Sequence, residues 1–420
     1  MPKTFVDAIR ICRALQIPHI WIDALCIVQD NNEEWQSEAA NMSEIYQGGQ
    51  LTITAVQSAD SSQGCFLSNE NIAKSDQLFF HTRPGTSGGH SSMVRVYHGD
   101  IRTTAMTSSV ISTRGWTLQE QLLSLRNVFC MDPDIHWQCQ AGYQTQTGIL
   151  FEPNGPLSNW DIAIPLRGPP STGGLYRTAW RRIIENYSLR EFTHVHDRIP
   201  AIAGLIHHFA STLKDTPILG LWGKSFARDL AWLRGRGRPQ LSGISKFPTW
   251  TWFACQGCVL YTIGDKYEEE PQQTGSLNLL DWIVEWDSTS YTSPLRRSFV
   301  RVHGSVREIP IRPFADGNLH VPPYFQVFNE DLQRTSKTRL PWRCAGRFDG
   351  GDEVAPATHL CLLLFSETRR SNPGYVYETF LILKAVEGQC TEIYTRVGLA
   401  RIWGQLPTFD STKIMTIVLI

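Results

Sequence analysis

Hydrophobic residues at the start of the chain recur with the spacing of an α-helix. Their intervals of three and four residues predict a helix with one buried face, formed by Phe5, Ala8, Ile9, Cys12 and Leu15. Thr4 and Asp7 have the spacing of a capping box, so we expect them to bond the free N–H groups of the first turn. Pro18 ends the helix, because proline lacks the N–H that a helix interior requires.

Strand-like and helix-like patterns then alternate along the first part of the chain. They predict strands at residues 19–22, 51–55, 127–130 and 135–138 and helices at residues 32–45 and 117–125. Asp23 stands at the carboxyl end of the first strand. Such alternation favours a mostly parallel sheet covered by helices.

Composition divides the chain into successive regions. We predict an α/β domain at residues 1–147, a linker rich in Gly and Pro at residues 148–175, a helical region at residues 176–246 and a β-rich region at residues 247–420. The fold class is therefore α/β, with a partly parallel sheet and flanking helices, followed by a helical segment and a β-rich C-terminal region. In the helical region, Asp197 is expected to cap the helix that follows it.

Charge and hydropathy exclude several classes of protein. The 420 residues include 39 Lys and Arg against 40 Asp and Glu, so a strongly basic nucleic-acid-binding protein is excluded. The start lacks the apolar core of a secretory signal, and the most apolar runs are far shorter than the roughly 20 residues that span a bilayer. Ten cysteines in such a chain predict reduced thiols. We expect a cytoplasmic protein with no membrane span and no nucleic-acid partner.

Three short motifs have competing interpretations. Cys255 and Cys258 form a C-x-x-C pair without nearby zinc ligands, so we favour two buried thiols. His194 and His196 would point the same way on an extended segment, as metal ligands do, yet no matching cluster appears elsewhere. An Arg-Gly-Arg-Pro sequence within residues 234–239 fits a DNA minor groove, but without a broader basic flank we favour a solvated loop. We predict no metal site.

Residues 21–30, which read WIDALCIVQD, place polar groups at the end of a predicted strand. Ligands of open α/β sheets bind outside the carboxyl ends of strands, so this segment is a candidate site. Its polar residues are Asp23, Cys26, Gln29 and Asp30. In the alternative interpretation, Asp23 and Asp30 are residues of turns and helix caps, and Cys26 packs in the core.

Residues 114–126, which read RGWTLQEQLLSLR, contain a second candidate group. Glu120 has the spacing to complete a capping box with Thr117. It has an alternative role as an acid or base that faces the Asp23 region. Arg114 is a potential partner of either carboxylate, and a buried carboxylate needs such a partner. Spacing alone does not separate these alternatives.

The two segments resemble sequence blocks of the fungal heterokaryon-incompatibility (HET) domain proteins. The first resembles that family's W-I-D-A-L-C-I-x-Q-D block and the second its R-G-W-T-x-Q-E-x-L-L-S-x-R block. Weaker matches extend from Thr4 to Trp252. The resemblance implies a motif core or ligand-binding set that consists of Trp21, Cys26, Gln29, Asp30, Arg114, Trp116, Gln119 and Arg126.

The resemblance also implies a function. Proteins of this family trigger programmed cell death on non-self recognition between fungal cells, a form of innate immunity, so we expect self-association or a protein partner. The family's domain has a proposed remote similarity to TIR domains, some of which cleave NAD with a glutamate. By analogy, NAD is a possible substrate, with Glu120 as the catalytic carboxylate and Asp23 in support. No cofactor is expected.

The chain departs from the family pattern at three places. The family's domain usually opens with a strand that reads like L-S-Y-x-W-G, and this chain starts after it, so we predict an N-terminally incomplete domain with an exposed sheet edge. Gly48 and Gly49 stand where Asn-Ala is usual, and Gln121 stands where Arg is common. An inactive truncated paralogue or a regulatory remnant is therefore a third interpretation, beside the cell-death trigger and the NAD-cleaving enzyme.

Overall fold

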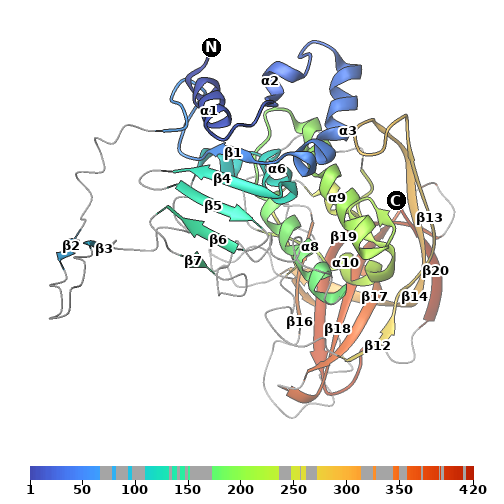
Figure 1. Ribbon diagram of the computed structural model, residues 1–420. Helices are drawn as coiled ribbons and strands as arrows, with labels where there is room; N and C mark the ends of the chain where they lie inside the picture. Colours follow the sequence, from blue (N-terminus) through green and yellow to red (C-terminus); the bar gives the residue numbers. More distant parts are fainter. Residues whose placement is uncertain are drawn as a thin grey trace. The chain divides into compact units, whose positions relative to one another are not determined.

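The computed structural model of the chain separates into two compact units, whose helices and strands are drawn in Figure 1. Unit 1 comprises Met1–Tyr176 with Arg190–Phe192, and unit 2 comprises Arg177–Leu189 with Thr193–Ile420. Most of the predicted linker at residues 148–175 lies outside the described residues. The structure describes residues 1–66, 78–81, 93–96, 109–131, 135–139, 142–146, 150–151, 173–235, 247–255, 257–261, 272–313, 325–327, 344–349, 357–369, 372–386, 388, 392–409 and 413–420.

Helix α1 (Lys3–Ala14) confirms the first predicted helix but starts differently. The Thr4 hydroxyl donates to the carbonyl of Ser61 at 3.1 Å, and the Asp7 carboxylate accepts from the N–H of Cys65 at 3.1 Å. Pro2 occupies the N-cap position, where no side chain caps the helix. The predicted capping box is therefore wrong, because both side chains bond a loop that is distant in sequence.

Helix α3 (Asn32–Gly48) begins where the sequence predicts it. The side chain of Asn31 accepts from the N–H groups of Glu33 and Glu34, which satisfies two of the free donors at the helix start. Its apolar face is directed inward, since Ala39 and Met42 are buried.

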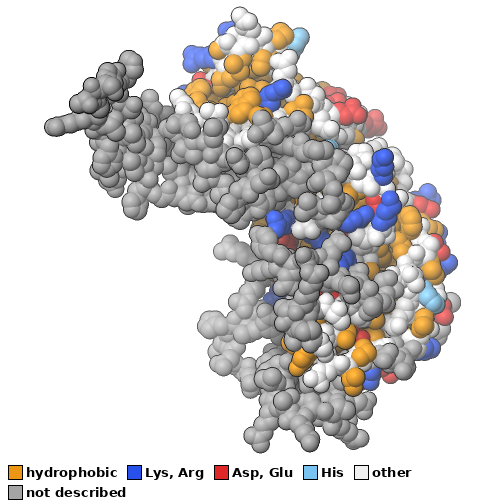
Figure 2. All heavy atoms as spheres, turned by 60° about the horizontal axis from the view of Figure 1, so that its bottom comes forward, with side chains coloured by type: hydrophobic (Ala, Val, Ile, Leu, Met, Phe, Trp, Pro, Cys, Tyr) orange, Lys and Arg blue, Asp and Glu red, His pale blue; other side chains and the backbone are white. Residues whose placement is uncertain are grey.

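Residues 19–22 do not form the predicted buried strand. The backbone at Ile22 is extended, with φ −136° and ψ 122°, but no strand in the described ranges pairs with this segment. Ile20 is 38% exposed, and the short helix α2 (Asp23–Cys26) follows directly. An apolar run becomes a buried strand only where a neighbouring strand bonds its backbone. Ile20 consequently remains on the surface. Figure 2 shows that hydrophobic side chains also reach the surface elsewhere among the described residues.

A five-stranded sheet forms the framework of unit 1, in the order β1-β4-β5-β6-β7 (Figure 1). Its strands are β1 (Thr52–Ala55), β4 (Arg126–Cys130), β5 (Ile135–Cys139), β6 (Gly142–Thr145) and β7 (Leu150–Phe151). Only β1 and β4 are parallel, with Ala55 opposite Cys130, and the other pairs are antiparallel. The short connections from β4 to β7 allow no crossover helix, so a mostly parallel sheet is wrong and a partly parallel one is confirmed.

Shorter elements complete unit 1. They are α5 (Val110–Thr113) and α6 (Thr117–Leu123), which precede β4, and the separate antiparallel pair β2 (Leu78–His81) and β3 (Met93–Val96). Leu118, Leu122 and Leu123 of α6 are buried, so this helix packs by its apolar face.

The helices of unit 2 bury large side chains. They are α8 (Gly173–Ser188), which enters unit 2 at Arg177, and α9 (Pro200–Leu213), and they are followed by η3 (Gly223–Ser225) and α10 (Phe226–Asp229). Trp180 of α8 and Phe209 of α9 are fully buried, with ring centroids 5.0 Å apart. Asp197 lies in the 3₁₀ turn η2 (Val195–Arg198), and no side chain caps α9. The predicted N-cap is wrong, because α9 starts instead with Pro200, whose missing N–H needs no partner there.

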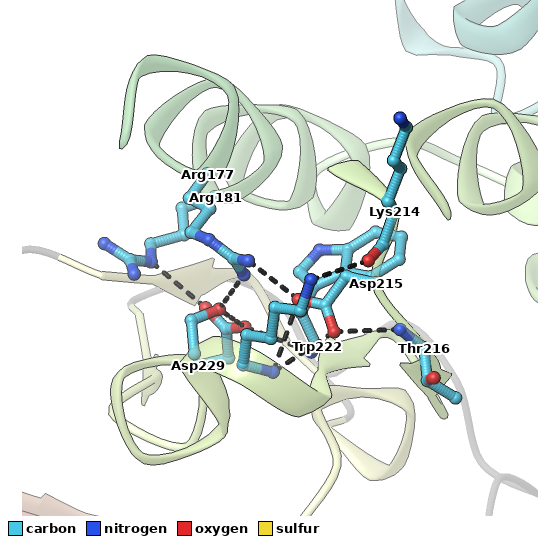
Figure 3. A network of polar contacts seen from close by, with 9 residues as sticks. Arg177, Arg181, Lys214, Asp215, Thr216, Trp222 and Asp229 are labelled. Carbon is cyan, nitrogen blue, oxygen red and sulfur yellow. Dashed lines mark hydrogen bonds and ion pairs between the residues drawn. The ribbon is translucent and has the colours of Figure 1, made fainter. Parts of the chain in front are cut away.

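Charged side chains link these helices in the network drawn in Figure 3. Arg177 pairs with Asp215 at 2.7 Å, and Arg181 pairs with Asp229 at 3.3 Å. Asp229 also accepts from the N–H of Trp222 at 3.1 Å. Burial raises the pKa of Asp229, and the Arg181 guanidinium and the hydrogen bonds act against that shift. The network therefore satisfies a carboxylate that would otherwise be costly to bury.

A nine-stranded sheet makes up most of unit 2, in the order β12-β17-β18-β19-β20-β14-β13, with β15 beside β14 and β16 beside β19. The strands are β12 (Gln272–Ser276), β13 (Asn278–Trp286), β14 (Leu295–Pro313), β15 (Phe325–Val327), β16 (Cys344–Phe348), β17 (Ala357–Arg369), β18 (Asn372–Ala385), β19 (Ile393–Gly404) and β20 (Lys413–Leu419). Pairing is antiparallel except between β19 and β20, which confirms the predicted β-rich C-terminal region. Two small pairs accompany it, namely β8 (Pro217–Ile218) with β9 (Leu221–Trp222) and β10 (Leu233–Arg234) with β11 (Val259–Leu260).

The weaker motifs of the sequence lie in or near unit 2. Cys255 and Cys258 are buried free thiols beside the 3₁₀ turn η4 (Trp252–Ala254). His194 and His196 stack with ring centroids 5.3 Å apart, and no metal-binding group of three or more His, Cys, Asp or Glu occurs within the described ranges. Residues 236–239 of the Arg-Gly-Arg-Pro motif lie outside them. Of the helices that the structure describes, none is long and apolar enough to cross a membrane.

Candidate functional site

Glu120 lies on α6, and the local geometry separates the two roles that its spacing left open. The hydroxyl of Thr117 donates to the carbonyls of Ile111 at 2.6 Å and Arg114 at 2.9 Å. Thr117 therefore closes the turn before α6 and forms no capping box with Glu120. The Glu120 carboxylate is directed to Tyr46 of α3 instead.

The C-terminal end of α6 is anchored to the sheet. Ser124 donates to the carbonyl of Glu120 at 2.5 Å and shares a hydrogen bond of 2.6 Å with Thr52 of β1. The side-chain amide of Asn127 donates to the carbonyl of Gln121 at 3.1 Å. These bonds satisfy free carbonyls of the last turn, and they fix the helix that carries Glu120 relative to β1 and β4.

Four polar side chains interact with Glu120, and we call the five residues together the carboxylate cluster: Asp23, Tyr46, Arg114, Glu120 and Arg190. The hydroxyl of Tyr46 donates a hydrogen bond to Glu120, and the other three members act on Glu120 through their charges. Asp23 and Arg114 are exposed, Tyr46 and Glu120 are partly buried, and Arg190 is buried. The cluster thus combines two carboxyl groups, two positively charged guanidinium groups and a phenol.

Glu120 ionises with difficulty in this setting. Burial raises the pKa of Glu120 to about 7, and the negative charge of Asp23 adds to the increase. Arg114, the hydrogen bond from Tyr46 and, to a smaller extent, Arg190 act in the opposite direction. Near neutral pH the carboxyl group is therefore present in both protonation states.

Tyr46 is a hydrogen-bond donor rather than a base. Its pKa lies far above the ordinary value because of burial, with the negative charges of Glu120 and Asp23 adding to the effect. The ring of Trp21 packs edge-on against it, with centroids 5.9 Å apart. Trp21 thereby fixes the phenol that bonds Glu120.

Asp23 is held at the first position of α2. Its carboxylate accepts from the N–H of Ala24 at 2.7 Å. The side-chain amide of Gln29 donates to the carbonyl of Asp23 at 3.3 Å and to that of Ile27 at 2.9 Å. Gln29 therefore closes the turn around α2, a positioning role, and does not itself belong to the carboxylate cluster.

Arg190 and Phe192 explain part of the R-G-W-T sequence. Arg190 donates to the carbonyl of Arg114 at 2.9 Å and to the hydroxyl of Thr117 at 3.0 Å. The N–H of Gly115 donates to the carbonyl of Glu191 at 2.9 Å. A Cβ atom at Gly115 would overlap the ring of Phe192, so glycine allows this close approach.

Comparison with protein families identifies the N-terminal region. Residues 1–120 match the family model described as "Heterokaryon incompatibility protein (HET)". The chain carries a HET domain. A search of curated proteins found no match to the chain, and a search of solved structures found none either.

The other candidate residues in and next to the HET domain are spread over unit 1. Trp116 packs edge-on against Trp35 of α3, with centroids 6.1 Å apart. Gln119 is fully buried, and neither polar atom of its amide has a partner among the described residues. Cys26 and Asp30 are exposed, and Arg126 is exposed at the start of β4, where it donates to the carbonyl of Gln50 at 3.4 Å. The structure thus brings Trp21, Asp23, Arg114 and Glu120 together and leaves these residues outside the cluster.

Sequence reasoning missed two members of the cluster. Tyr46 lies on the apolar stripe of α3, where it reads as a core residue. A signal existed, since a buried tyrosine hydroxyl usually needs a hydrogen-bond partner. Arg190 lies 70 residues after Glu120, and no spacing rule connects the two segments.

The carboxylate cluster has the chemistry of an acid–base or ligand-binding site. A carboxyl group with a pKa of about 7 can donate or accept a proton at physiological pH. Arg114 supplies an exposed positive charge next to it, which suits an anionic group of a ligand.

Proposed function

We propose that this chain triggers cell death of the heterokaryon-incompatibility type on non-self recognition in fungi, and that its HET domain acts through the carboxylate cluster. The match of residues 1–120 to the HET family carries the proposal. The cluster supports it, because it joins both sequence blocks at Glu120. The domain acts in the cytoplasm, by self-association or by contact with a partner protein.

Inducible expression in a fungal host tests this proposal. We would compare the parent chain with Glu120→Gln, which keeps the shape of the side chain and removes its charge. Glu44→Gln is the matched control, because Glu44 is an exposed glutamate on α3, two residues from Tyr46. Immunoblots would verify equal amounts of soluble protein.

We expect colony death with the parent chain and with Glu44→Gln, and survival with Glu120→Gln. Death in all three strains would remove Glu120 from the proposal and favour a role in assembly. Survival in all three, with soluble protein present, would contradict the death-triggering function and favour an inactive or regulatory protein.

The near-neutral pKa of Glu120 favours a second candidate function, the hydrolysis of NAD. In that reaction water replaces nicotinamide at the ribose carbon, which passes through a cation-like transition state. A carboxylate next to this carbon stabilises the developing positive charge, as in glycoside hydrolysis. Arg114 would bind the pyrophosphate of NAD.

Incubation of purified protein with NAD tests the second candidate. We expect nicotinamide and ADP-ribose to appear with the parent chain and with Glu44→Gln, and a loss of at least about a hundredfold in rate with Glu120→Gln. Unchanged NAD in the presence of a chain that kills cells would reject the hydrolase and leave the first proposal standing.

A further inference from the structure

A hollow of about 690 Å³ lies on one face of the nine-stranded sheet of unit 2. Residues 247–249 line it together with parts of β14, β19 and β20 and the residue that follows β20, Ile420. Small-molecule sites in proteins typically enclose roughly 300–1,000 Å³, so the hollow has the dimensions of a ligand site. All of its described lining residues belong to unit 2.

The floor of the hollow is the outward face of three strands, of which β14 and β20 lie side by side in Figure 1. Arg301 of β14 is opposite Val418 of β20, which is opposite Ile393 of β19. Side chains opposite each other in a sheet point to the same face, and so do side chains two residues apart. Phe299 therefore shares this face, whereas Val300 is fully buried on the other. Phe299, Val418 and Ile393 are half-buried, so the floor is an accessible apolar surface.

Residues 247–249 form one wall of the hollow, and this wall is fixed to the sheet. The N–H and the hydroxyl of Thr249 both donate to the carbonyl of Ile420, at 3.2 Å and 3.0 Å. The ring of Phe247 packs edge-on against Phe253, with centroids 5.6 Å apart. The wall is therefore already formed before a ligand arrives, which reduces the entropic cost of binding.

A β-bulge brings two consecutive arginines to the hollow. Residues 295 and 297 of β14 are opposite the neighbouring residues 286 and 285 of β13, so Arg296 is an extra residue in β14. Such a residue interrupts the alternation of side chains between the two faces. Both Arg296 and Arg297 consequently line the hollow, and both are exposed.

The arginines give the hollow a positive charge. Arg301 is neutralised by its ion pair with Asp281 at 2.8 Å, whereas Arg296 and Arg297 form no ion pair with another described residue. The guanidinium group of Arg297 lies 5.5 Å from the centre of the Phe299 ring, next to the apolar floor. Among the described residues that line the hollow none is acidic, although the whole chain has 39 Lys and Arg against 40 Asp and Glu.

We propose that this hollow binds a small molecule that combines an apolar body with a carboxylate or a similar anionic group. The apolar body lies on Phe299, Val418 and Ile393, where its burial contributes through the hydrophobic effect. The anionic group is bound by Arg296 and Arg297, because a guanidinium group donates paired hydrogen bonds to an oxyanion. A ligand with both parts should therefore bind more tightly than a ligand with either part alone.

Displacement of a fluorescent dye tests the proposal. The purified full chain would be titrated with anilinonaphthalene sulfonate, an aromatic anion that emits more strongly in apolar surroundings. Decanoate would then compete with the dye, while decanol carries only the apolar body and inorganic phosphate only an anionic group. We expect saturable binding of the dye, and displacement by decanoate at a concentration at least about tenfold lower than by decanol or phosphate. Equal displacement by decanoate and decanol, or no saturable binding of the dye, would overturn the proposal.

Matched variants assign the binding to the hollow. Arg296→Gln and Arg297→Gln should each weaken the affinity for decanoate by roughly tenfold, because each removes a charged hydrogen-bond donor. Arg13→Gln removes the same charge from an exposed position on α1 and should change the affinity by less than about twofold. Circular dichroism would verify that the variants are folded. Equal affinities of the parent chain and all three variants, or an equal loss in all three, would also overturn the proposal.

Discussion

Glu120 is an acidic residue that its surroundings hold close to the neutral form. Its pKa in the folded chain is about 7, above the ordinary value of 4.5. The folded state thus binds a proton more tightly than the unfolded state does. The contribution of Glu120 to stability is fully present below about pH 4.5 and is lost as the pH rises through about 7.

Replacement by glutamine tests this dependence. Each pKa unit corresponds to ~1.4 kcal/mol, and partial exposure reduces the effect. As the pH rises from about 4.5 through about 7, the parent chain should lose unfolding free energy on the order of 1–3 kcal/mol that Glu120→Gln keeps. Urea unfolding of both proteins across this pH range measures it. Glu44→Gln should keep the parent's pH dependence, and parallel curves for the parent and Glu120→Gln would contradict the prediction.

Tyr46 acts on the ionisation of Glu120 in the direction opposite to burial, because its hydrogen bond lowers the pKa of that carboxyl group. Its hydroxyl stabilises the Glu120 carboxylate, so Tyr46→Phe should raise the pKa of Glu120 further, by roughly one unit. Trp21 still packs against the remaining ring, which favours a folded variant. NMR titration of the glutamate carboxyl carbons measures the change, with Glu120→Gln used to assign the resonance. A pKa that stays the same or falls would show that the hydrogen bond does not act on the ionised form.

At the scale of elements, the turn between α5 and α6 depends on one close contact. Phe192 occupies the space that a Cβ atom of residue 115 would take. We expect Gly115→Ala to displace the ring and to lower the free energy of unfolding by about 1–3 kcal/mol.

Gly48→Ala is the matched control for this prediction. Gly48 lies at the end of α3, where an added Cβ meets no atom within 4 Å. Alanine there should be neutral or stabilise the helix by up to about 1 kcal/mol. Urea denaturation compares the two variants, and equal effects would show that the contact with Phe192 is dispensable.

The helices and strands of this chain could be predicted where the pattern of hydrophobic residues within one segment is enough to specify its secondary structure. The stripes of α1 and α3 and the runs of β1 and β4 correspond to their segments. The apolar run at residues 19–22 failed as a prediction, because a strand needs a neighbour and the sequence does not state whether one is present. The predicted cap at Thr4 is wrong because its hydroxyl donates to the carbonyl of Ser61 instead. The predicted cap at Asp197 is wrong because no side chain caps the start of α9.

The candidate site was predictable only in part. The two blocks contain Asp23, Arg114 and Glu120, but spacing could not tell a helix cap from an acid–base group at Glu120. Tertiary packing excludes the cap, since the Thr117 hydroxyl bonds the preceding turn and α3 and α6 bring Tyr46 to Glu120. The roles of these residues in any reaction stay predictions.

At the scale of the whole molecule, the chain consists of two compact units, each with its own buried groups. In unit 2, the Arg396 side chain is fully buried, lies 3.4 Å from the centre of the Trp232 ring and pairs with Asp349 at 2.8 Å. It also donates to the carbonyl of Leu230 at 2.7 Å. Arg396→Met leaves these acceptors unpaired, so we expect a loss of about 3–5 kcal/mol.

Calorimetry separates this effect from effects on unit 1. We expect two unfolding transitions, of which Arg396→Met lowers one and Gly115→Ala the other. Arg301→Met is the control, because the Arg301–Asp281 pair is exposed and should contribute no more than about 1 kcal/mol. A single transition that all three variants shift together would contradict independent unfolding of the units.

Because the pKa of Glu120 is near neutral, a charged ligand that binds beside it should change how many protons the HET domain holds. Near pH 7 both protonation states are populated, so a cationic group in contact with Glu120 would expel a fraction of a proton into the buffer. An anionic group would draw a similar amount in. Titration calorimetry in two buffers of different ionisation enthalpy measures this proton flux, and its sign would give the charge of the ligand before its chemistry is known.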